Sequence, residues 1–385
     1  INKILIVTLL NFFSIGVNAA TIWVGSSAAC TGTNVRASLP LAIFEAGVNG
    51  QASDEIRLTN TVNHTGNTNG NHILTDWSAG GGGTLTIVGG YSDCFTSTPS
   101  GRTIVGDSNS SSFTVNTNNQ ANSIVTLRNL ELSNNDSRGL VVRTGGIVTL
   151  DNVDIRLNGF SGVDIGEGGI VEILSNSIVR NNDNINNPFG GGVRCTGTNS
   201  SVTIHGIIEK NRAQKGGNIF VSTGCYAELK DGMRVNGNAA GGLIDAVNGG
   251  GLYVDNGGQV LADGRANRVI FDANRAEIGG SIYLNGTGFA ALQNTHINGS
   301  EAPAGAAIYA TGTGSNILQL TMDKTINCGL LFACSEIQGS RHSGSVVEAW
   351  NTNIMIQRTV IEQSEYFGSP TIFAIGLIEL NNSIG

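Results

Sequence analysis

The chain has 385 residues, a formal net charge of −8 and a sequence pI of about 5.1, so it offers no basic stripe for nucleic acid or anionic lipid. It is rich in glycine and asparagine, with 55 and 44 residues, and only 13% of its residues are charged. A hydrophobic content of 40% excludes intrinsic disorder and is enough for a sizeable core.

Residues 1–19 predict a secretory signal peptide. Lys3 is a minimal positive start, Ile4–Leu10 with the two following phenylalanines forms an apolar core, and Val17–Ala19 is a small-residue cleavage site. The apolar segment is too short for a stable membrane span, and the remaining alternative is a buried first strand. We therefore expect the mature chain to be secreted or displayed at the cell surface.

Residues 20–123 predict an N-terminal cap followed by the first strand-rich coils. Short strands are expected at Glu55–Leu58 and Thr84–Val88. The segment Leu39–Ala46 is the one convincing helix, with Ser38 as N-cap and Gly47 just past its end. We expect this amphipathic helix to cover the open end of the strand stack rather than to bind a partner.

Residues 124–385 repeat a pattern in which an apolar residue is followed three positions later by Asn or Ser. Adjacent copies are separated by 23 to 40 residues, which is typical of one turn of a β-solenoid with loops of variable length. The repeats are Leu132–Asn135, Ile155–Asn158, Ile178–Asn181, Ile208–Asn211, Val235–Asn238, Phe271–Asn274, Ile297–Ser300, Ile337–Ser340 and Ile361–Ser364. The pattern still runs where the sequence stops at Gly385, so we expect the solenoid to be truncated there.

Stacked coils explain the recurring polar residue. One coil cannot bury its apolar side chains alone, but stacking at about 4.8 Å pairs each strand with its equivalents above and below. Asn tolerates left-handed backbone at a corner, and stacked amides hydrogen-bond one another, so a structural ladder is expected. A carbohydrate-binding row is the alternative. Glycines at the next corner, from Gly139 to Gly344, are expected to provide positive φ.

Six cysteines in an exported chain are potential disulfide partners. Cys328 and Cys334 lie close together inside the longest insertion, and Cys195 and Cys225 lie one coil apart. Cys30 and Cys94 would then tie the start of the domain to an early coil. None has the spacing of a zinc site, and metal binding is not expected.

The segments Phe271–Asn274 and Gly279–Ile282 resemble the paired FxxN and GG[AS]I motifs of polymorphic outer-membrane proteins, a group of autotransporter-like passengers. Gly216–Ile219 is a looser copy. The resemblance covers residues 124–380 and implies a right-handed parallel β-helix, here of about a dozen coils, together with surface exposure, association with the outer membrane and adhesion. The C-terminal barrel that exports those proteins is missing from the sequence.

The same pectin lyase-like fold carries polysaccharide lyases and hydrolases, so catalysis has to be judged at a site. The repeat register places Glu131 and Asp154 on neighbouring coils about 5 Å apart, with Arg156 beside them. Paired carboxylates are the minimum for glycoside hydrolysis. This trio is the weak candidate for catalysis or, in an enzyme, for calcium binding. The alternative is an ordinary ion pair on a solvated face.

Other chemistry-bearing residues form no recognisable motif. The five histidines occupy unrelated registers, and no nucleotide loop, metalloprotease motif or nucleophile elbow is present. Trp23, Trp77 and Trp350 are either sugar platforms or packing residues.

We therefore predict a monomeric, non-catalytic, adhesin-like binding scaffold without a cofactor, whose partner is a host-cell or extracellular protein or polysaccharide. The alternatives are an enzyme that acts on acidic glycans and a structural surface spacer.

Overall fold

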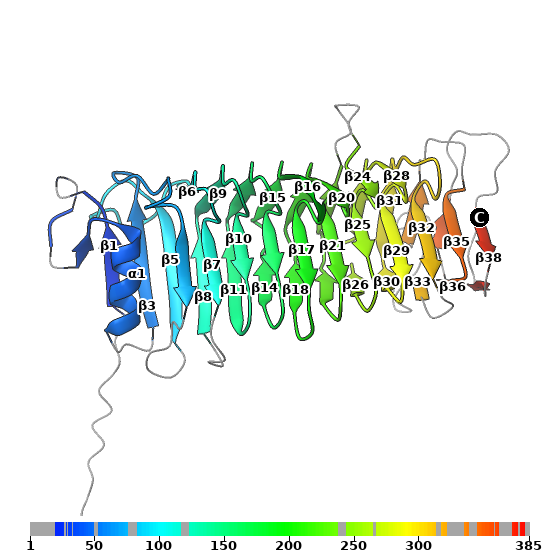
Figure 1. Ribbon diagram of the computed structural model, residues 1–385, viewed down its shortest axis with the longest axis horizontal. Coiled ribbons are helices and arrows are strands. Elements are labelled where there is room, and N and C mark those ends of the chain that lie inside the picture. Colours follow the sequence, from blue (N-terminus) through cyan, green and yellow to red (C-terminus); the bar gives the residue numbers. More distant parts are fainter. Residues whose placement is uncertain are drawn as a thin grey trace, which may run out of the picture.

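A computed structural model describes residues 20–381 except 27, 29, 33, 50–52, 76–82, 117–122, 238–243, 265–266, 313–316, 322–334, 339–344, 358, 362–371 and 376–377. Within these ranges the chain forms one helix and 39 strands in four parallel sheets. Each coil adds one strand to each of three long sheets, and the coils stack in chain order into an elongated rod (Figure 1). The prediction of a parallel β-helix is confirmed.

Sheets A and B lie on two successive sides of each coil. Sheet A contains β1 (Ala20–Val24), β2 (Val35–Arg36), β3 (Ser53–Thr59), β5 (Thr84–Tyr91), β8 (Ser123–Arg128), β11 (Gly146–Asp151), β14 (Ile170–Ile173), β18 (Ser201–Ile204), β22 (Tyr226–Leu229), β26 (Gln259–Asp263), β30 (Phe289–Gln293), β33 (Ile317–Thr321), β36 (Asn353–Gln357) and β39 (Ile378–Asn381). Sheet B contains β6 (Thr103–Gly106), β9 (Leu130–Ser133), β12 (Asp154–Arg156), β15 (Ile178–Arg180), β19 (Ile207–Glu209), β23 (Arg234–Asn236), β27 (Val269–Asp272), β31 (Thr295–Asn298), β34 (Ser335–Gln338) and β37 (Thr359–Ile361).

Sheet C completes each coil, and a short sheet D is inserted between sheets B and C. Sheet C contains β4 (His72–Thr75), β7 (Phe113–Asn116), β10 (Leu140–Val142), β13 (Val163–Ile165), β17 (Val193–Thr196), β21 (Ile219–Ser222), β25 (Leu252–Val254), β29 (Ile282–Gly286), β32 (Ile308–Gly312), β35 (Val347–Trp350) and β38 (Ile372–Ile375). Sheet D contains β16 (Asp183–Phe189), β20 (Arg212–Lys215), β24 (Ala246–Asn248) and β28 (Ala276–Ile278).

The repeated apolar residue fills the bore of the solenoid. Its side chains form one inward row on sheet B and are at most 1% exposed from β6 to β34. The row consists of Val105, Leu132, Ile155, Val179, Ile208, Val235, Phe271, Ile297 and Ile337. Each row member contacts its equivalents on the coils above and below, so burial comes from stacking and not from any one coil.

The repeat predicted at Ile178–Asn181 lies one residue later in the structure, at Val179 and Asn182. The inward partner of Ile155 is Val179 and not Ile178, which pairs with Asp154 on the outward side. Consequently Asn182 is fully buried, whereas Asn181 is exposed with a φ of 53°. Two adjacent apolar residues and two adjacent asparagines make both registers compatible with the pattern, and stacking on the neighbouring coils selects one.

The buried polar residues form the predicted ladder. Each amide donates from Nδ2 to the Oδ1 of the next coil, at 2.7 Å from Asn135 to Asn158 and at 2.8 Å from Asn158 to Asn182. The Asn182 amide donates in turn to Asn211 at 2.9 Å. These side chains are at most 2% exposed, so they are not available to a carbohydrate. Asn238, Ser340 and Ser364 lie outside the described residues.

The ladder continues through the glycine-rich motif. Asn211 donates to Asn218 Oδ1 at 3.0 Å, and Asn218 donates to Asn274 at 3.2 Å. Asn274 then reaches Ser281 Oγ at 3.3 Å, and Ser281 lies 2.6 Å from Ser300. In Gly216–Ile219 and Gly279–Ile282 the third residue therefore bonds the Asn that precedes it in the chain, which explains why the two motifs occur together there.

The corner glycines serve two purposes, of which the sequence predicted one. Gly216 has a φ of 64°, as expected for a left-handed corner. Gly162 is not in the positive-φ region, and a Cβ placed there would lie 2.5 Å from Val179 and 2.7 Å from the Asn182 amide. At this position the small residue is needed because the ladder approaches the backbone closely.

Helix α1 (Leu39–Val48) lies against β1 and β3 at the N-terminal end of the rod (Figure 1). It runs through Gly47, so the predicted end was two residues too early, and the Ser38 side chain makes no capping hydrogen bond. Leu39, Ala42 and Ala46 are buried against the first coils, while Phe44 on the opposite face is exposed. In the described part of the chain, no helix has the length and hydropathy of a membrane span.

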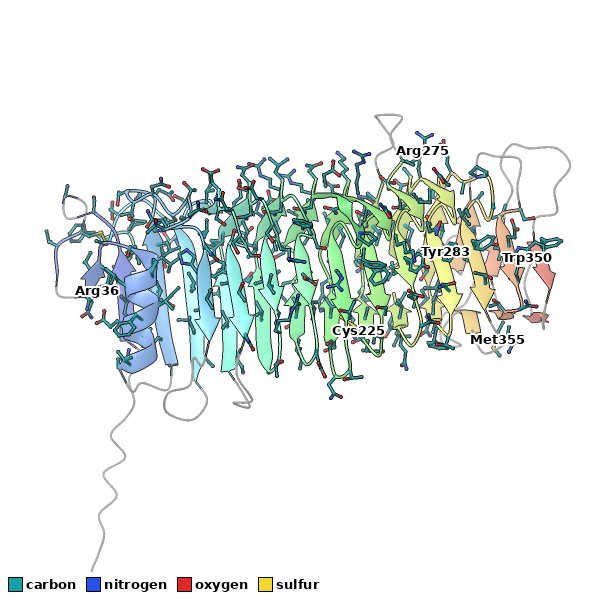
Figure 2. All side chains as sticks on the ribbon, viewed as in Figure 1. Arg36, Cys225, Arg275, Tyr283, Trp350 and Met355 are labelled. Carbon is teal, nitrogen blue, oxygen red and sulfur yellow. A yellow bond between two sulfur atoms is a disulfide. The ribbon has the colours of Figure 1, made fainter. Side chains whose placement is uncertain are left out.

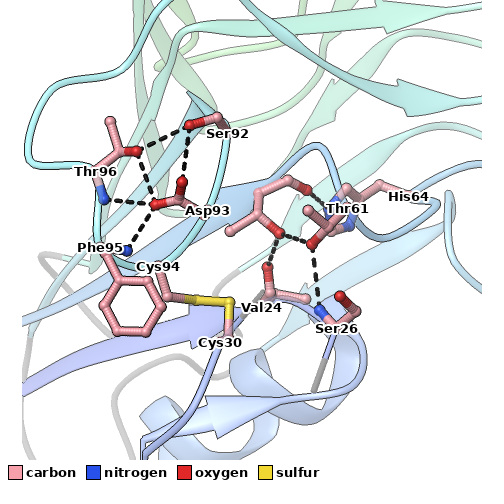
Figure 3. Close-up of a disulfide and its surroundings, with 11 residues drawn as sticks. Val24, Ser26, Cys30, Thr61, His64, Ser92, Asp93, Cys94, Phe95 and Thr96 are labelled. Carbon is pink, nitrogen blue, oxygen red and sulfur yellow. Dashed lines mark hydrogen bonds between the residues drawn. A yellow bond between two sulfur atoms is a disulfide. The ribbon is translucent and has the colours of Figure 1, made fainter. Parts of the chain in front are cut away.

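Two of the predicted disulfides are present. Cys30–Cys94 joins the segment after β1 to the loop after β5, beside a hydrogen-bonded turn around Asp93 (Figure 3). Cys195–Cys225 joins adjacent coils, and both sulfur-bearing residues are fully buried. Cys328 and Cys334 lie outside the described residues.

Candidate functional site

The predicted trio lies on the outward side of sheet B. Glu131 in β9 and Asp154 in β12 are register partners on adjacent coils, as the repeat spacing predicts. Arg156 donates from Nη2 to Glu131 Oε1 at 2.9 Å, and its Nε lies 4.0 Å from Asp154 Oδ2. The sequence therefore brought the right residues together, and the structure adds further partners to them.

Two of these partners lie outside β9 and β12. Arg180 in β15 holds Asp154 with both prongs of its guanidinium, at 3.2 Å from Nε and 2.7 Å from Nη2. Arg102, in the segment before β6, brings Nη1 to 3.6 Å from the same carboxylate. The hydrogen bond that Arg180 donates to Asp154 raises the pKa of Arg180, and the Asp154 side chain is only 3% exposed.

These contacts oppose a catalytic role for the carboxylate pair. A general acid or base has to exchange a proton with a substrate within hydrogen-bond reach. Asp154 is covered and engaged by guanidinium groups, and Glu131 is engaged by Arg156. Such pairing favours a structural role for both carboxylates.

The sequence missed a second cluster, on the outward side of sheet C. Asp164 in β13 is fully buried and contacts three arginines. Its Oδ2 lies 2.6 Å from Arg138 Nε and accepts a hydrogen bond from Arg143 Nη2 at 2.7 Å. Its Oδ1 accepts a hydrogen bond from Arg194 Nη1 at 2.8 Å.

Electrostatic attraction in this cluster exceeds the cost of burial. Burial raises the pKa of Asp164, but Arg143, Arg194 and Arg138 together hold it below the ordinary value for aspartate. The four residues come from a turn, a strand end and two strands. The sequence contained one indication of this cluster, because Asp164 and Arg194 are register partners on neighbouring coils. The repeat pattern aligns strands only, so it does not place Arg138 or Arg143.

The hollow nearest to the first cluster lies where sheet B begins. It has a volume of 520 Å³ and is lined by residues 60–65 and 102–104. Arg102, on its wall, already donates to the backbone and side chain of Asn152 at 3.0 and 2.7 Å. His64 contacts the Thr59 carbonyl oxygen through Nε2 at 3.1 Å. These contacts hold the Arg102 side chain and the His64 ring in place at the wall of the hollow.

His72 in β4 is the most strongly perturbed histidine of the described residues. Its ring lies 5.1 Å from that of Phe113, and the residue is 2% exposed. Burial lowers the pKa of His72 to about 4, the nearby Asn69 backbone opposes the shift, and His64 adds to it. His72 is therefore a neutral core residue and not a ligand.

The N-terminal coils are expected to lose stability as the pH falls from 6.5 to 4. In that range His72 takes up a proton in the unfolded chain but not in the folded chain, which favours unfolding by up to about 3 kcal/mol. A His72→Leu variant, followed by thermal unfolding across this range, should show a flatter pH dependence. An unchanged pH dependence in the variant would show that His72 is not responsible.

The two described tryptophans pack against other side chains. Trp23 lies 5.0 Å from Tyr91 in an edge contact, with Arg57 over its ring at 5.2 Å. Trp350 lies 5.0 Å from Phe373 and donates from Nε1 to Glu348 at 2.8 Å. These contacts favour the packing interpretation over sugar platforms. Trp77 lies outside the described residues.

A second aromatic feature was not predicted. Aromatic side chains on the outward side of sheet C stack along the rod beneath sheet D, together with Phe189 of β16. Tyr283, a member of this stack, is labelled in Figure 2. Tyr253 and Tyr283 are stacked at 4.8 Å, and burial raises the pKa of Tyr283 to about 12. The full stack is Phe189, Phe220, Tyr253, Tyr283 and Tyr309. Because each ring face is covered by its neighbour, the stack is a small outer core.

His205 and His296 contact other charged side chains and do not contribute to a metal centre among the described residues. His205 faces Glu172 at 3.6 Å, and His296 contacts Arg268 at 3.2 Å. Among the described residues, no three His, Cys, Asp or Glu side chains gather as metal ligands would. His342 lies outside this part of the chain.

No protein-family model matches this chain, and no curated protein or solved structure matches it. The resemblance to passenger repeats therefore rests on the motifs Phe271–Asn274 and Gly279–Ile282. Their polar residues, Asn274 and Ser281, meet in the ladder described above.

Proposed function

We propose that this protein is a non-catalytic extracellular scaffold that binds an acidic polysaccharide. The observation that carries the proposal is the excess of arginine in the two outward clusters. Six guanidinium groups surround three carboxylates there, in a protein whose net charge is −8. They belong to Arg102, Arg138, Arg143, Arg156, Arg180 and Arg194.

The positions of these arginines suit an extended anionic polymer. They lie on four successive coils of a parallel β-helix, three beside sheet B and three beside sheet C, and their side chains are 25% to 34% exposed. Guanidinium groups bind carboxylate and sulfate groups through paired hydrogen bonds. The carboxylates beneath them hold the side chains in place, which lowers the entropy cost of binding.

Exposure outside the cell is part of the proposal. The two disulfides favour an oxidising compartment, and the predicted signal peptide supplies the route. The resemblance of the repeats to outer-membrane passengers supports an adhesin-like role at the cell surface. A structural spacer remains the alternative, and it requires no ligand.

The enzyme alternative has one observation in its favour. Glu131 and Asp154 are stacked on adjacent coils with a basic group between them, as a carboxylate pair of a lyase or hydrolase would be. The pairing of both carboxylates with arginine opposes it. Binding without turnover is the function that these contacts support best.

The test is incubation of the purified full chain with polygalacturonate, alginate and chondroitin, with and without calcium. We expect retention of the protein in affinity electrophoresis and no release of unsaturated or reducing ends. Product formation that is abolished by Glu131→Gln or Asp154→Asn would replace the scaffold with an enzyme. Absence of both binding and turnover would favour the spacer.

A further inference from the structure

We propose that Arg138, Arg143 and Arg194, gathered around Asp164, form an oxyanion-binding subsite for a carboxylate or sulfate group of an acidic polysaccharide. This inference rests on the proposed scaffold function and assigns it to one place on sheet C. The aspartate acts as a positioning residue, and the guanidinium groups contact the ligand.

The cluster around Asp164 has an excess of positive charge. Three guanidinium groups share one carboxylate, so the cluster carries an excess of two positive charges. Both oxygens of Asp164 are occupied by these contacts. The remaining donors of the three arginines have no second carboxylate among the ion pairs of the described residues.

Arg194 and Arg143 are held in different ways. The Nε of Arg194 is buried, and no acceptor in the described part of the protein accepts its hydrogen bond. Arg143, in contrast, is held at the backbone, because its Nη1 donates to the carbonyl oxygens of Val142 at 3.2 Å and Asp164 at 3.1 Å.

The arginine side chains are partly exposed, although the carboxylate that they share is buried. Asp164 is completely buried, whereas the three arginine side chains are 25% to 32% exposed. The buried carboxylate therefore orients three side chains that are partly exposed to solvent. Arg138 is further supported by the ring of Phe160, 5.4 Å from its Cζ.

The cluster lies at the open edge of sheet D. That sheet begins with β16, whose last residue, Phe189, contacts Phe220, the register neighbour of Arg194. Asp164 lies one coil earlier, where the described chain has no sheet D strand over sheet C. A Cβ at Gly166 would lie 2.7 Å from the Arg143 side chain, so glycine leaves room for that guanidinium.

The experiment compares three polymers and four forms of the full chain. Polygalacturonate presents carboxylates, dextran sulfate presents sulfates, and dextran is the uncharged control. The site variants are Arg138→Gln and Arg194→Gln. The matched control is Arg275→Gln, because Arg275 also pairs with one carboxylate, Glu301, at 26% exposure and lies on a distant coil. Dissociation constants are measured by calorimetry at low salt.

We expect each site variant to weaken binding of one or both anionic polymers by at least about tenfold, and the control to stay within about twofold. The polymer that loses affinity identifies the carboxylate or the sulfate as the natural group. Thermal unfolding is measured in parallel. If a glutamine variant does not fold, Arg194→Lys replaces it, because it keeps the charge and loses the planar fork.

The outcomes separate the site from the function. Anionic polymers that bind equally well to all four forms would overturn the subsite and leave the scaffold function standing. Equal binding of dextran and dextran sulfate, with no binding of polygalacturonate, would also overturn it. Absence of binding to every polymer would overturn the scaffold function itself.

Discussion

Replacing Asn182 by Leu is expected to lower the free energy of unfolding by about 3–5 kcal/mol, because several buried polar groups lose their partner at once. Asn182 Oδ1 accepts hydrogen bonds from the backbone and side-chain nitrogens of Asn158, at 3.1 and 2.8 Å. Its Nδ2 donates to the Ile155 carbonyl oxygen at 3.1 Å and to Asn211 at 2.9 Å. Urea unfolding, followed by circular dichroism, measures the change.

The neighbouring residue provides the control. Asn181 is exposed and has a φ of 53°, so Asn181→Gly removes its side chain without straining the backbone. We expect this variant to stay within about 0.5 kcal/mol of the original chain. Similar losses in the two variants would show that the ladder does not stabilise the stack.

Replacing Asp164 by Ala is expected to destabilise the protein by about 3 kcal/mol, because three guanidinium groups lose their only shared counter-charge. The buried carboxylate lies within 2.6 to 2.8 Å of a nitrogen of each arginine. The partial exposure of the arginines lets them turn toward water, which limits the loss. The matched control is Asp183→Ala, which removes an exposed carboxylate that faces Arg212 at 3.2 Å and should change stability by less than about 1 kcal/mol.

The effect of Asp164 has a defined pH dependence. Its pKa in the folded chain lies below the ordinary value of 3.8, so its contribution is present above pH 3.8. The contribution is lost as the pH falls through the lower, folded-state pKa. The stability difference between the original chain and Asp164→Ala should therefore be constant near neutrality and shrink below pH 3.8. A difference that is largest in acid would contradict this account.

The amino-acid sequence determined the architecture because the period of the pattern and the period of the structure are the same. Every coil has to present an apolar residue to the bore and a polar or small residue to a corner. The repeats from Leu132 to Ile297 therefore predicted the sheet B core row except at Ile178. The Cys195–Cys225 disulfide was likewise predictable, because these cysteines lie one coil apart, and Cys30 and Cys94 were then the pair left to join the start of the domain to an early coil.

Only the tertiary structure decided the details that depend on neighbouring coils. Both registers of β15 satisfy the local pattern, and the choice of Asn182 over Asn181 is made by the amides of Asn158 and Asn211. The ladder also passes through Asn218, which belongs to the other motif.

The candidate sites divide in the same way. Glu131, Asp154 and Arg156 lie in strands and follow the repeat register, so their proximity was predicted. The cluster at Asp164 includes Arg138 from a turn and Arg143 from beyond a strand end. Long side chains from irregular segments reach across coils in directions that no periodic pattern specifies. Stacking by itself determines which strands are neighbours, and three-dimensional packing decides which charged groups meet on their outer face.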